Sequence, residues 1–406
     1  MAKNRKILIS GASVAGPALA FWLRRCGFEP TIVERAPALR PGGYAIDFRG
    51  ASLRVLERMG LRAEVERMQT RIGAITIVDR NNRKVASMPD GFTSGELEIL
   101  RGDLARIFYE ATRATTEYIF DDTIAGMEES SEGVDVVLER GGRRTFDLVA
   151  GADGLHSRVR SIAFGAEASF VRYLGYCVAI FTIPNYLNLD RSGLYYGTLG
   201  RKVGIFSGGD PREAKASFFF ATEPLDYDRH DIAQQKNILR EHFEHQGWEL
   251  PRLLELMESA PDFYFDSVSQ VKMSRWSAGR KVLLGDAAYC ASPLSGMGTG
   301  MAVVGAYVLA GELAEADGDY RVAFANYENR MRTFVEKCQG IADGGTDWFV
   351  PRTRFRLWLS NQMWKILPYT PWKNMMIDVP MKIANSIHLK EYEFDAALSE
   401  SAPCLP

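Results

Sequence analysis

The sequence predicts a mixed α/β fold in which a parallel sheet is interrupted by an antiparallel sheet and is followed by a helical C-terminal segment. Three observations support this prediction. A strand, a glycine-rich turn and a helix open the chain, a strand-rich block fills residues 166–277, and the α/β pattern returns at Lys281. At 406 residues the chain also exceeds the usual size of one hydrophobic core, so two domains are expected.

The first forty residues follow the order of a βαβ unit. Residues 6–9 predict a strand buried on both faces, and residues 31–33 predict a second strand that ends at Glu34. Between them lie the turn at 11–16 and a helix that ends at Gly27. This order is that of a Rossmann-like nucleotide-binding unit.

The turn keeps the first and third glycines of a dinucleotide-binding motif, Gly11 and Gly16, but has Ser13 in the middle. Because the middle glycine normally lets a pyrophosphate approach the backbone, Ser13 predicts a looser contact. Glu34 follows about twenty residues later, where a carboxylate accepts hydrogen bonds from ribose hydroxyls. The alternative is a tight turn with a solvated Glu34; the surrounding strand and helix favour the nucleotide.

The middle of the chain has a different pattern. A hairpin is expected at 74–78 with its turn at Asn81 and Asn82, followed by strands at 176–183, 193–196, 202–206 and 217–220 and helices at 231–246 and 253–257. The predicted division gives 1–72, 97–165 and 280–345 to the nucleotide-binding domain, 73–96 and 166–279 to a substrate domain, 346–394 to a C-terminal helical segment and 395–406 to a tail.

Two later segments complete the predicted nucleotide site. Residues 151–154 read Gly-Ala-Asp-Gly directly after a predicted strand. A second strand ends in Gly285-Asp286, and a glycine-rich turn at 296–300 precedes a helix from about Met301 to about Gln339. Such a turn removes side chains from a surface, so that a flat ligand can lie against backbone, and the helix start offers unpaired N–H groups and partial positive charge.

These three segments, in this order, resemble the fingerprints of the single-component flavin-dependent aromatic hydroxylases, the class A family related to p-hydroxybenzoate hydroxylase. The resemblance covers roughly residues 6–339. Within that family the chain is most similar to the flavin monooxygenases that inactivate tetracyclines, on the segments 40–47, 100–104, 181–186 and 285–296. The resemblance implies a Rossmann-like FAD-binding domain, an inserted antiparallel substrate domain and a C-terminal helix.

The resemblance also implies roles for individual residues. Glu34 and Arg35 would hold the adenosine half of FAD, Asp47 and Arg101 would contact FAD, and Asp286 would contact its ribityl chain. Asp153 and Gly154 match the motif tied to both FAD and NADPH, and Arg40 matches a position linked to the nicotinamide donor. The full expected cofactor-binding set is Gly11, Ser13, Ala15, Gly16, Glu34, Arg35, Arg40, Asp47, Arg101, Asp153, Gly154, Asp286, Pro293, Gly296 and Gly298.

Several of these residues have simpler alternatives. Arg101 could pair with Asp103, Asp286 could cap the helix that follows it, and Arg40 could be a solvated loop arginine. No acid–base residue is predicted, and no metal site. His242 and His245 stand three apart on a predicted helix, a spacing more typical of a polar face than of a metal pair.

The chain departs from the family pattern at three positions. Tyr289, Met297 and Gly300 stand where relatives often have histidine, glutamine and asparagine. Since the glutamine and asparagine lie near the flavin ring in relatives, we expect backbone N–H groups to hold the polar edge of the ring here.

The implied reaction uses NADPH or NADH and O2 to oxygenate an aromatic or polycyclic, polyketide- or tetracycline-like molecule through a C4a-hydroperoxyflavin. The helix near Met301 would stabilise negative charge on the reduced ring. Phe206, Phe218 and Phe220 could wall a dry pocket or form ordinary sheet core. Alternatives are an oxidase or reductase on the same fold, and a non-catalytic FAD- or ligand-binding protein; a halogenase is disfavoured because the Trp-x-Trp-x-Ile-Pro signature is absent.

Composition excludes other classes of function. Lys plus Arg is 49 and Asp plus Glu is 51, a net charge of −2 that predicts no affinity for nucleic acid or for an anionic membrane. Five scattered cysteines, no signal peptide and no apolar span predict a cytoplasmic protein with reduced thiols, as a monomer or homodimer. The tryptophan-containing C-terminal helix could close over the substrate entrance, form a dimer surface or pack on the core.

Overall fold

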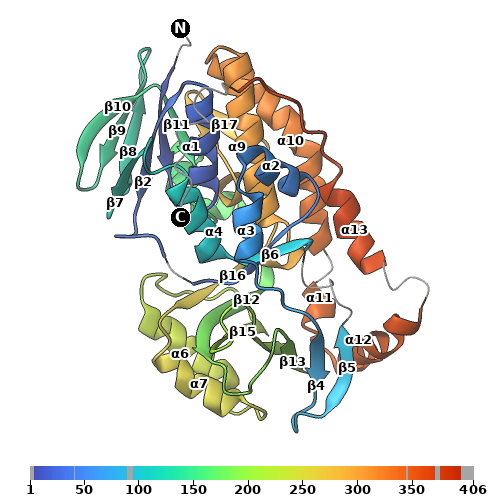
Figure 1. Cartoon of the computed structure of the whole chain (residues 1–406). Helices are drawn as coiled ribbons and strands as arrows, with labels where there is room; N and C mark the ends of the chain where they lie inside the picture. The colour runs from blue at the N-terminus through green and yellow to red at the C-terminus, as the bar shows by residue number, and fades with distance from the viewer. Residues whose placement is uncertain (1–3, 41, 89–94, 344–345, 371–374, 395–406) are drawn as a thin grey trace.

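The computed structural model describes residues 4–40, 42–88, 95–343, 346–370 and 375–394, so the predicted tail at 395–406 lies outside the described residues. It contains a parallel sheet with helices, a long antiparallel sheet below it and helices at the C-terminus (Figure 1). The predicted fold class is confirmed.

The upper sheet has six strands in the order β17-β18-β11-β1-β2-β7, parallel except for β17. Three buried residues of β1, from Ile7 to Ile9, are at most 2% exposed, which explains the unbroken apolar run in the sequence. The strands are β1 (Lys6–Ser10), β2 (Glu29–Glu34), β7 (Glu117–Phe120), β11 (Leu148–Gly151), β17 (Ser277–Ala278) and β18 (Lys281–Leu283).

Helices cover one side of this sheet (Figure 1). Helix α9 (Gly298–Glu315) is buried almost all round, because it packs against α1 (Ala15–Arg25), α2 (Ala51–Met59) and α10 (Tyr320–Ala342). The single helical run predicted from Met301 to Gln339 is wrong in one respect: it is two helices. The break falls at Asp317 and Gly318, which both have positive φ.

A three-stranded antiparallel sheet, which the sequence did not lead us to expect, covers the other side of the parallel strands (Figure 1). Alternate residues of its central strand, Val134, Val136 and Leu138, are at most 3% exposed and join the main core. The strands are β8 (Ile124–Glu129), β9 (Val134–Leu138) and β10 (Gly142–Phe146), and α5 (Arg158–Phe164) follows.

The lower sheet has seven strands in the order β16-β12-β15-β14-β13-β4-β5. Its early strands β4 and β5 join the far edge, where β4 runs parallel to β13. The strands are β4 (Ile75–Val78), β5 (Lys84–Met88), β12 (Val171–Pro184), β13 (Gly193–Thr198), β14 (Arg201–Phe206), β15 (Glu213–Ala221) and β16 (Phe263–Val271). A separate two-stranded sheet is formed by β3 (Ala45–Phe48) and β6 (Leu97–Leu100), and further helices are α3 (Arg62–Arg67), α4 (Arg101–Glu110) and α8 (Asp286–Tyr289).

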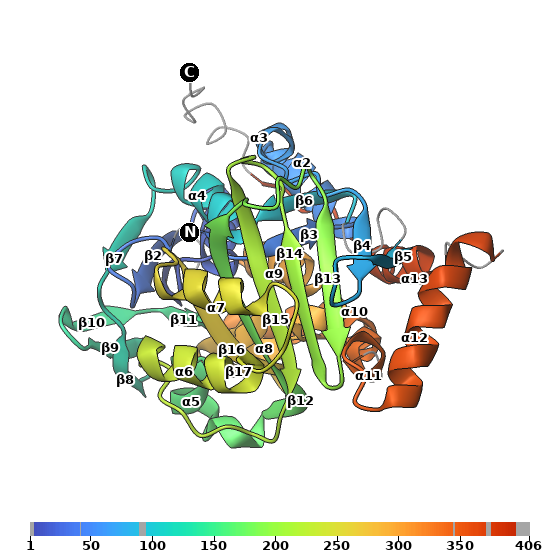
Figure 2. The same cartoon turned by 90° about the horizontal axis from the view of Figure 1, so that it is seen from below.

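One face of the lower sheet is covered by α6 (Ile232–Phe243) and α7 (Leu250–Glu258), as Figure 2 shows. Phe218 and Phe220 lie on this face and pack against Phe243. Phe206 pairs with Lys215 and therefore lies on the opposite face, since side chains alternate along a strand. The idea that the three phenylalanines form one wall is wrong; Phe218 and Phe220 are ordinary core.

The C-terminal segment forms several short helices: α11 (Thr346–Phe349), α12 (Arg354–Ile366) and α13 (Met375–Ala384). Helix α12 packs on β5 at the sheet edge (Figure 2), while Phe349 of α11 contacts Tyr195 and Phe219 on the open face. Phe355 and Trp358 remain exposed on α12. Over the described residues, every helix is too short or too polar to cross a membrane.

The assignment of Phe218 to the core can be tested by stability. Truncation in Phe218→Ala should cost about 3–5 kcal/mol of unfolding free energy, because the ring is fully buried and would leave a cavity. On the covering helix α6, the control Ile232→Ala should change the free energy of unfolding by less than about 0.5 kcal/mol, since that side chain is 53% exposed. Denaturant unfolding of both variants measures the difference; equal effects would contradict the assignment.

Candidate active site

Three turns that are far apart in sequence meet at the carboxyl edge of the upper sheet. A Cβ added to Gly11 would lie 2.5 Å from the carbonyl oxygen of Ala152, and one added to Gly285 would lie 3.3 Å from the Cβ of Ala15. Gly11 and Gly285 also have positive φ. The nucleotide-binding turn, the Asp-Gly turn and the Gly-Asp turn therefore form one surface with few side chains.

Within the first turn, Gly11 and Gly16 let two stretches of backbone pack closely against each other. A Cβ on Gly16 would be 1.9 Å from the carbonyl oxygen of Gly11, so no larger residue fits without moving backbone. The middle position has a different use: the hydroxyl of Ser13 accepts a hydrogen bond from Arg101 Nη1 at 2.7 Å. Ser13 thus joins an arginine to the turn.

Glu34 is held at the base of the same turn. Its carboxylate accepts hydrogen bonds from the backbone N–H groups of Ala12, at 2.8 Å, and Ala36, at 2.9 Å. This contact places the carboxylate at the carboxyl end of β2, where a ribose would lie in a Rossmann-like site. The next residue, Arg35, is exposed and lies 3.5 Å from His230.

Asp153 lies beside Gly11, in the turn that precedes α5. Its carboxylate accepts hydrogen bonds from the backbone N–H groups of Arg158 and Val159 and from the hydroxyls of Ser10 and Ser157. Burial raises the pKa of Asp153, and these donors offset part of that effect. Gly154 follows with φ +81° and open space around it. The Asp153 carboxylate therefore caps the first turn of α5, and both of its oxygens accept hydrogen bonds from groups of the protein.

Arg101 and Asp286 lie close together below the turns. The charge of Arg101 acts on Asp286, whose pKa is raised chiefly by burial. Asp286 Oδ1 would be 3.6 Å from a Cβ at Gly298, so the carboxylate lies at the start of α9. The alternative partner of Arg101 is not used, because Asp103 pairs with Arg106. This places a cation, a carboxylate and a helix N-terminus at one point.

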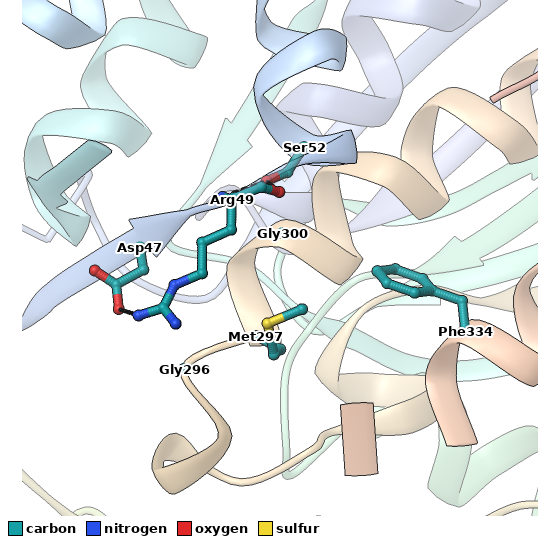
Figure 3. A pocket seen from close by; sticks show the side chains of 7 residues that line it. All are labelled: Asp47, Arg49, Ser52, Gly296, Met297, Gly300 and Phe334. Atoms are coloured by element: carbon teal, nitrogen blue, oxygen red, sulfur yellow. Dashed lines mark hydrogen bonds and ion pairs between the residues drawn. The ribbon is translucent and has the colours of Figure 1, made fainter. Parts of the chain in front are cut away.

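A small cavity opens beside them between β3, α2 and α9 (Figure 3). On one side Asp47 accepts a hydrogen bond from Arg49 at 3.1 Å and from the backbone N–H of Gly95 at 2.8 Å. Burial raises the pKa of Asp47, and Arg49 counters this. The lining residues are Asp47, Arg49, Ser52, Gly296, Met297, Gly300 and Phe334.

Two of the three departures from the family pattern, Gly300 and Tyr289, have local partners. A Cβ at Gly300 would be 3.2 Å from Ser52 Oγ, so α9 and α2 approach closely at this glycine. Tyr289 is buried, accepts a hydrogen bond from Tyr327 at 3.0 Å and occupies the space left by Gly305. These neighbours explain how glycine and tyrosine fit at their positions.

Two predicted residues lie apart from this cluster. Arg40 is exposed, and none of the described residues forms a hydrogen bond or ion pair with it. Pro293 is also exposed and begins a short 3-10 turn that leads into Gly296. The structure thus brings most of the expected residues to one surface, with Arg40 and Pro293 at its margin.

The open face of the lower sheet lies against these turns. Leu294 packs in the same cluster as Phe219, and the ring of Tyr264 on β16 lies 5.8 Å from that of Tyr44. Tyr44 also accepts a hydrogen bond from the backbone N–H of Arg101 at 3.0 Å. A ligand on this face would therefore lie next to the cofactor surface.

Sequence reasoning missed the most unusual residue of this face, Lys202. It is 8% exposed, and its Nζ lies 4.4 Å from the ring centre of Tyr195 and 3.9 Å from that of Phe349. None of the described residues gives it a hydrogen bond or a carboxylate partner, and burial lowers its pKa to about 7. The signal was present in the sequence, because Lys202 alternates with Gly204 and Phe206 on a predicted strand.

Glu98 is a second buried titratable group near this face. It is 8% exposed and hydrogen-bonded to Thr70, and its charge acts on Tyr195. Burial, with the charge of Asp47, raises the pKa of Glu98 to about 7. Glu98 pairs in register with Asp47 across β3 and β6, so it lies between the small cavity and the open face.

The role of Arg101 in holding the cofactor can be measured directly. Replacing it in Arg101→Gln should weaken FAD binding roughly 10- to 100-fold, the effect of losing a charge-assisted hydrogen-bond donor. The matched variant Arg106→Gln, on the same helix with a side chain 58% exposed, should bind FAD as the parent does. Titration of apoprotein followed by flavin fluorescence gives both constants, and equal affinities would exclude the predicted contact.

The chain is similar in sequence and fold to proteins of known class. The family model described as FAD binding domain matches residues 4–172. A flavin-dependent monooxygenase of Legionella longbeachae is 38% identical over 398 residues, which cover 97% of this chain and 100% of the relative. The crystal structures of the tetracycline destructases Tet(51) and Tet(55) superpose with TM-scores of 0.83 and 0.82 at 35% and 37% identity, each covering 97% of this chain and 100% of theirs.

The geometry fits the group that the family binds. The close-packed glycine turns leave backbone accessible, Glu34 lies at the end of β2, and Arg101 and Asp286 lie beside the start of α9. The earlier resemblance to the flavin hydroxylases and the expectation of an FAD enzyme are confirmed by these relatives. The chain belongs to the flavin-dependent monooxygenases and is an FAD-dependent oxidoreductase.

Proposed function

We propose that this enzyme uses NADPH or NADH and O2 to oxygenate an aromatic or polycyclic substrate that carries an acidic hydroxyl or enol. The observation that carries the proposal is Lys202, a buried cation without a carboxylate partner among the described residues, on the aromatic face next to the cofactor surface. A phenolate or enolate oxygen is the ligand that such a cation lacks.

The surroundings of Lys202 support a flat, apolar substrate. Tyr195, Phe206, Phe219 and Phe349 lie on the same face, and the ring of Phe206 covers Gly204. Aromatic rings offer large contact area to a planar ligand and exclude water from it. Tetracyclines combine several fused rings with acidic enols, and the solved relatives Tet(51) and Tet(55) are described as tetracycline destructases.

The chain would contribute position and electrostatics to the reaction. FAD, when bound, supplies the redox chemistry by accepting a hydride from the nicotinamide and reacting with O2. The start of α9 would stabilise negative charge at the polar edge of the flavin ring through backbone N–H groups, since Met297 and Gly300 offer no side-chain donor there. Asp286 and Arg101 would orient the cofactor, and Lys202 would orient the electron-rich ring toward it.

The assay that tests this function follows three quantities at once. Purified protein with FAD, NADPH or NADH and a panel of polycyclic phenols and tetracyclines should consume reductant and O2 in equal amounts. The product should gain one oxygen atom, which derives from labelled O2 by mass spectrometry. Hydrogen peroxide with an unoxygenated product would instead indicate an oxidase, and no reductant consumption with any substrate would indicate a ligand-binding protein.

The role of Lys202 predicts a loss of substrate affinity. In Lys202→Met the KM for the oxygenated substrate should rise about tenfold, the effect of losing one ionic hydrogen bond, while FAD content stays unchanged. Lys202→Arg should retain part of the affinity because it keeps the charge. Lys84→Met, which removes an exposed lysine from β5 of the same sheet, serves as the control.

The same residue predicts a pH dependence. The pKa of Lys202 lies near 7 in the free enzyme because burial disfavours the ammonium form. The anion-binding form is the protonated one, so affinity for a substrate that is already ionised should be full below about pH 7 and should fall as pH rises above it. Substrate Kd across pH 6–9, measured by quenching of flavin fluorescence, checks this, and an unchanged profile in Lys202→Arg would contradict it.

A further inference from the structure

His156 lies between two carboxylates that belong to different parts of the molecule. Its Nδ1 is 3.0 Å from Glu167 Oε1, and its Nε2 is 3.0 Å from Asp266 Oδ1. The imidazole side chain is 28% exposed and Asp266 is 12% exposed, so water screens this contact only partly. Only the imidazolium has a proton on both ring nitrogens, and so only that form donates to both carboxylates at once.

The contact between His156 and Asp266 connects the two sheets. His156 follows β11 of the FAD-binding part and Glu167 follows α5, whereas Asp266 lies on β16 of the lower sheet. Asp266 accepts a second hydrogen bond from the hydroxyl of Tyr264 at 3.3 Å. Tyr264 packs against Tyr44, so the contacts continue from His156 to the residue that bonds Arg101.

Other charged and titratable groups surround this path. Glu167 also meets Arg229 at 3.4 Å and the buried Arg160 at 3.6 Å. Arg160 and Arg229 act on Glu167, and the charge of Asp266 acts on Tyr44, Tyr264, Tyr227, Cys177, Cys290 and Asp286. Arg160 and Arg229 form ion pairs with Glu167, whereas His156 is the basic group in contact with Asp266.

We propose that His156 is a positioning residue: as an imidazolium it ties the segment after β11 in the FAD-binding part to Glu167 and to Asp266 of the substrate sheet, and through Asp266 it fixes Tyr264 against Tyr44 beside the cofactor surface. This inference rests on FAD binding at the surface of Arg101 and Asp286. It is independent of which substrate the enzyme oxygenates, and its tests need no substrate.

Because only protonated His156 donates to both carboxylates, the stability that this contact provides depends on pH. Burial alone would lower the pKa of His156, but its hydrogen bonds and the charges of Asp266 and Glu167 raise it above the ordinary value of 6.5. A raised folded-state pKa stabilises the fold fully below the unfolded value, and this contribution is lost as pH rises through the folded-state pKa. The enzyme should therefore lose stability at mildly alkaline pH through this one group.

The first experiment compares the holoenzyme with His156→Gln and with the control His242→Gln. His242 is the matched histidine, because its Nδ1 bonds the backbone carbonyl of Ile238 at 2.8 Å and none of the described residues pairs a carboxylate with its ring. The unfolding midpoint of the parent and of His242→Gln should fall as pH rises above 6.5, while that of His156→Gln should be lower and flatter. Parallel curves for all three proteins would overturn the proposal.

The second experiment separates positioning from general destabilisation. In a double-mutant cycle of His156→Gln and Asp266→Asn, the double variant should lose less stability than the sum of the two single variants, since both remove the same contact. Additive losses would contradict a direct tie.

The third experiment records the visible spectrum of bound FAD. In the parent the spectrum should shift with pH, because Tyr264 and Tyr44 move, and in His156→Gln it should stay constant. A retained spectral shift in that variant would also overturn the proposal. Failure of the proposed oxygenation with every substrate would leave all these measurements unaffected, so the two ideas fail separately.

Discussion

Close packing of backbone against backbone is the constraint on which the rest of the structure depends. Gly16 touches Gly11, Gly11 touches Ala152, and Gly285 touches Ala15, so three turns share one surface that any added side chain would fill. Because β1 lies between β11 and β2, the sheet order itself brings these turns together. The cofactor surface is therefore a property of topology first and of individual side chains second.

The parts of the fold that follow from local pattern were predictable. The apolar run of β1, the turn at Gly11 and the strand ending in Gly285 have strong sequence signals, and the family resemblance supplied their order. The strands β8 to β10 were not predicted, because short alternating runs between Glu128 and Phe146 resemble polar loops when the core that they cover is unknown. The break at Asp317 and Gly318 has a local signal that was overlooked.

Side-chain partners were harder to predict than positions. The sequence pointed to Asp153 and Ser13 as site residues. It did not predict that Asp153 caps α5 or that Ser13 accepts a hydrogen bond from Arg101. The register of the lower sheet decided that Phe218 faces α6 while Lys202 faces the cofactor surface, and a shift of one residue would exchange them. Long-range register of this kind depends on tertiary packing, so Lys202 and the contact of His156 with Asp266 required the structure.

The position of the β4–β5 hairpin has a consequence for how this chain is made. Residues 75–88 belong to the lower sheet, yet their neighbour β13 begins at Gly193, more than a hundred residues later. During synthesis one edge of this hairpin stays unpaired until β13 has been made. The strands β3 and β6, which flank the hairpin in the sequence, can already pair with each other at that stage. The two sheets are thus interleaved along the chain: the lower sheet receives its last strand with β16, and the upper sheet is completed only afterwards with β17 and β18.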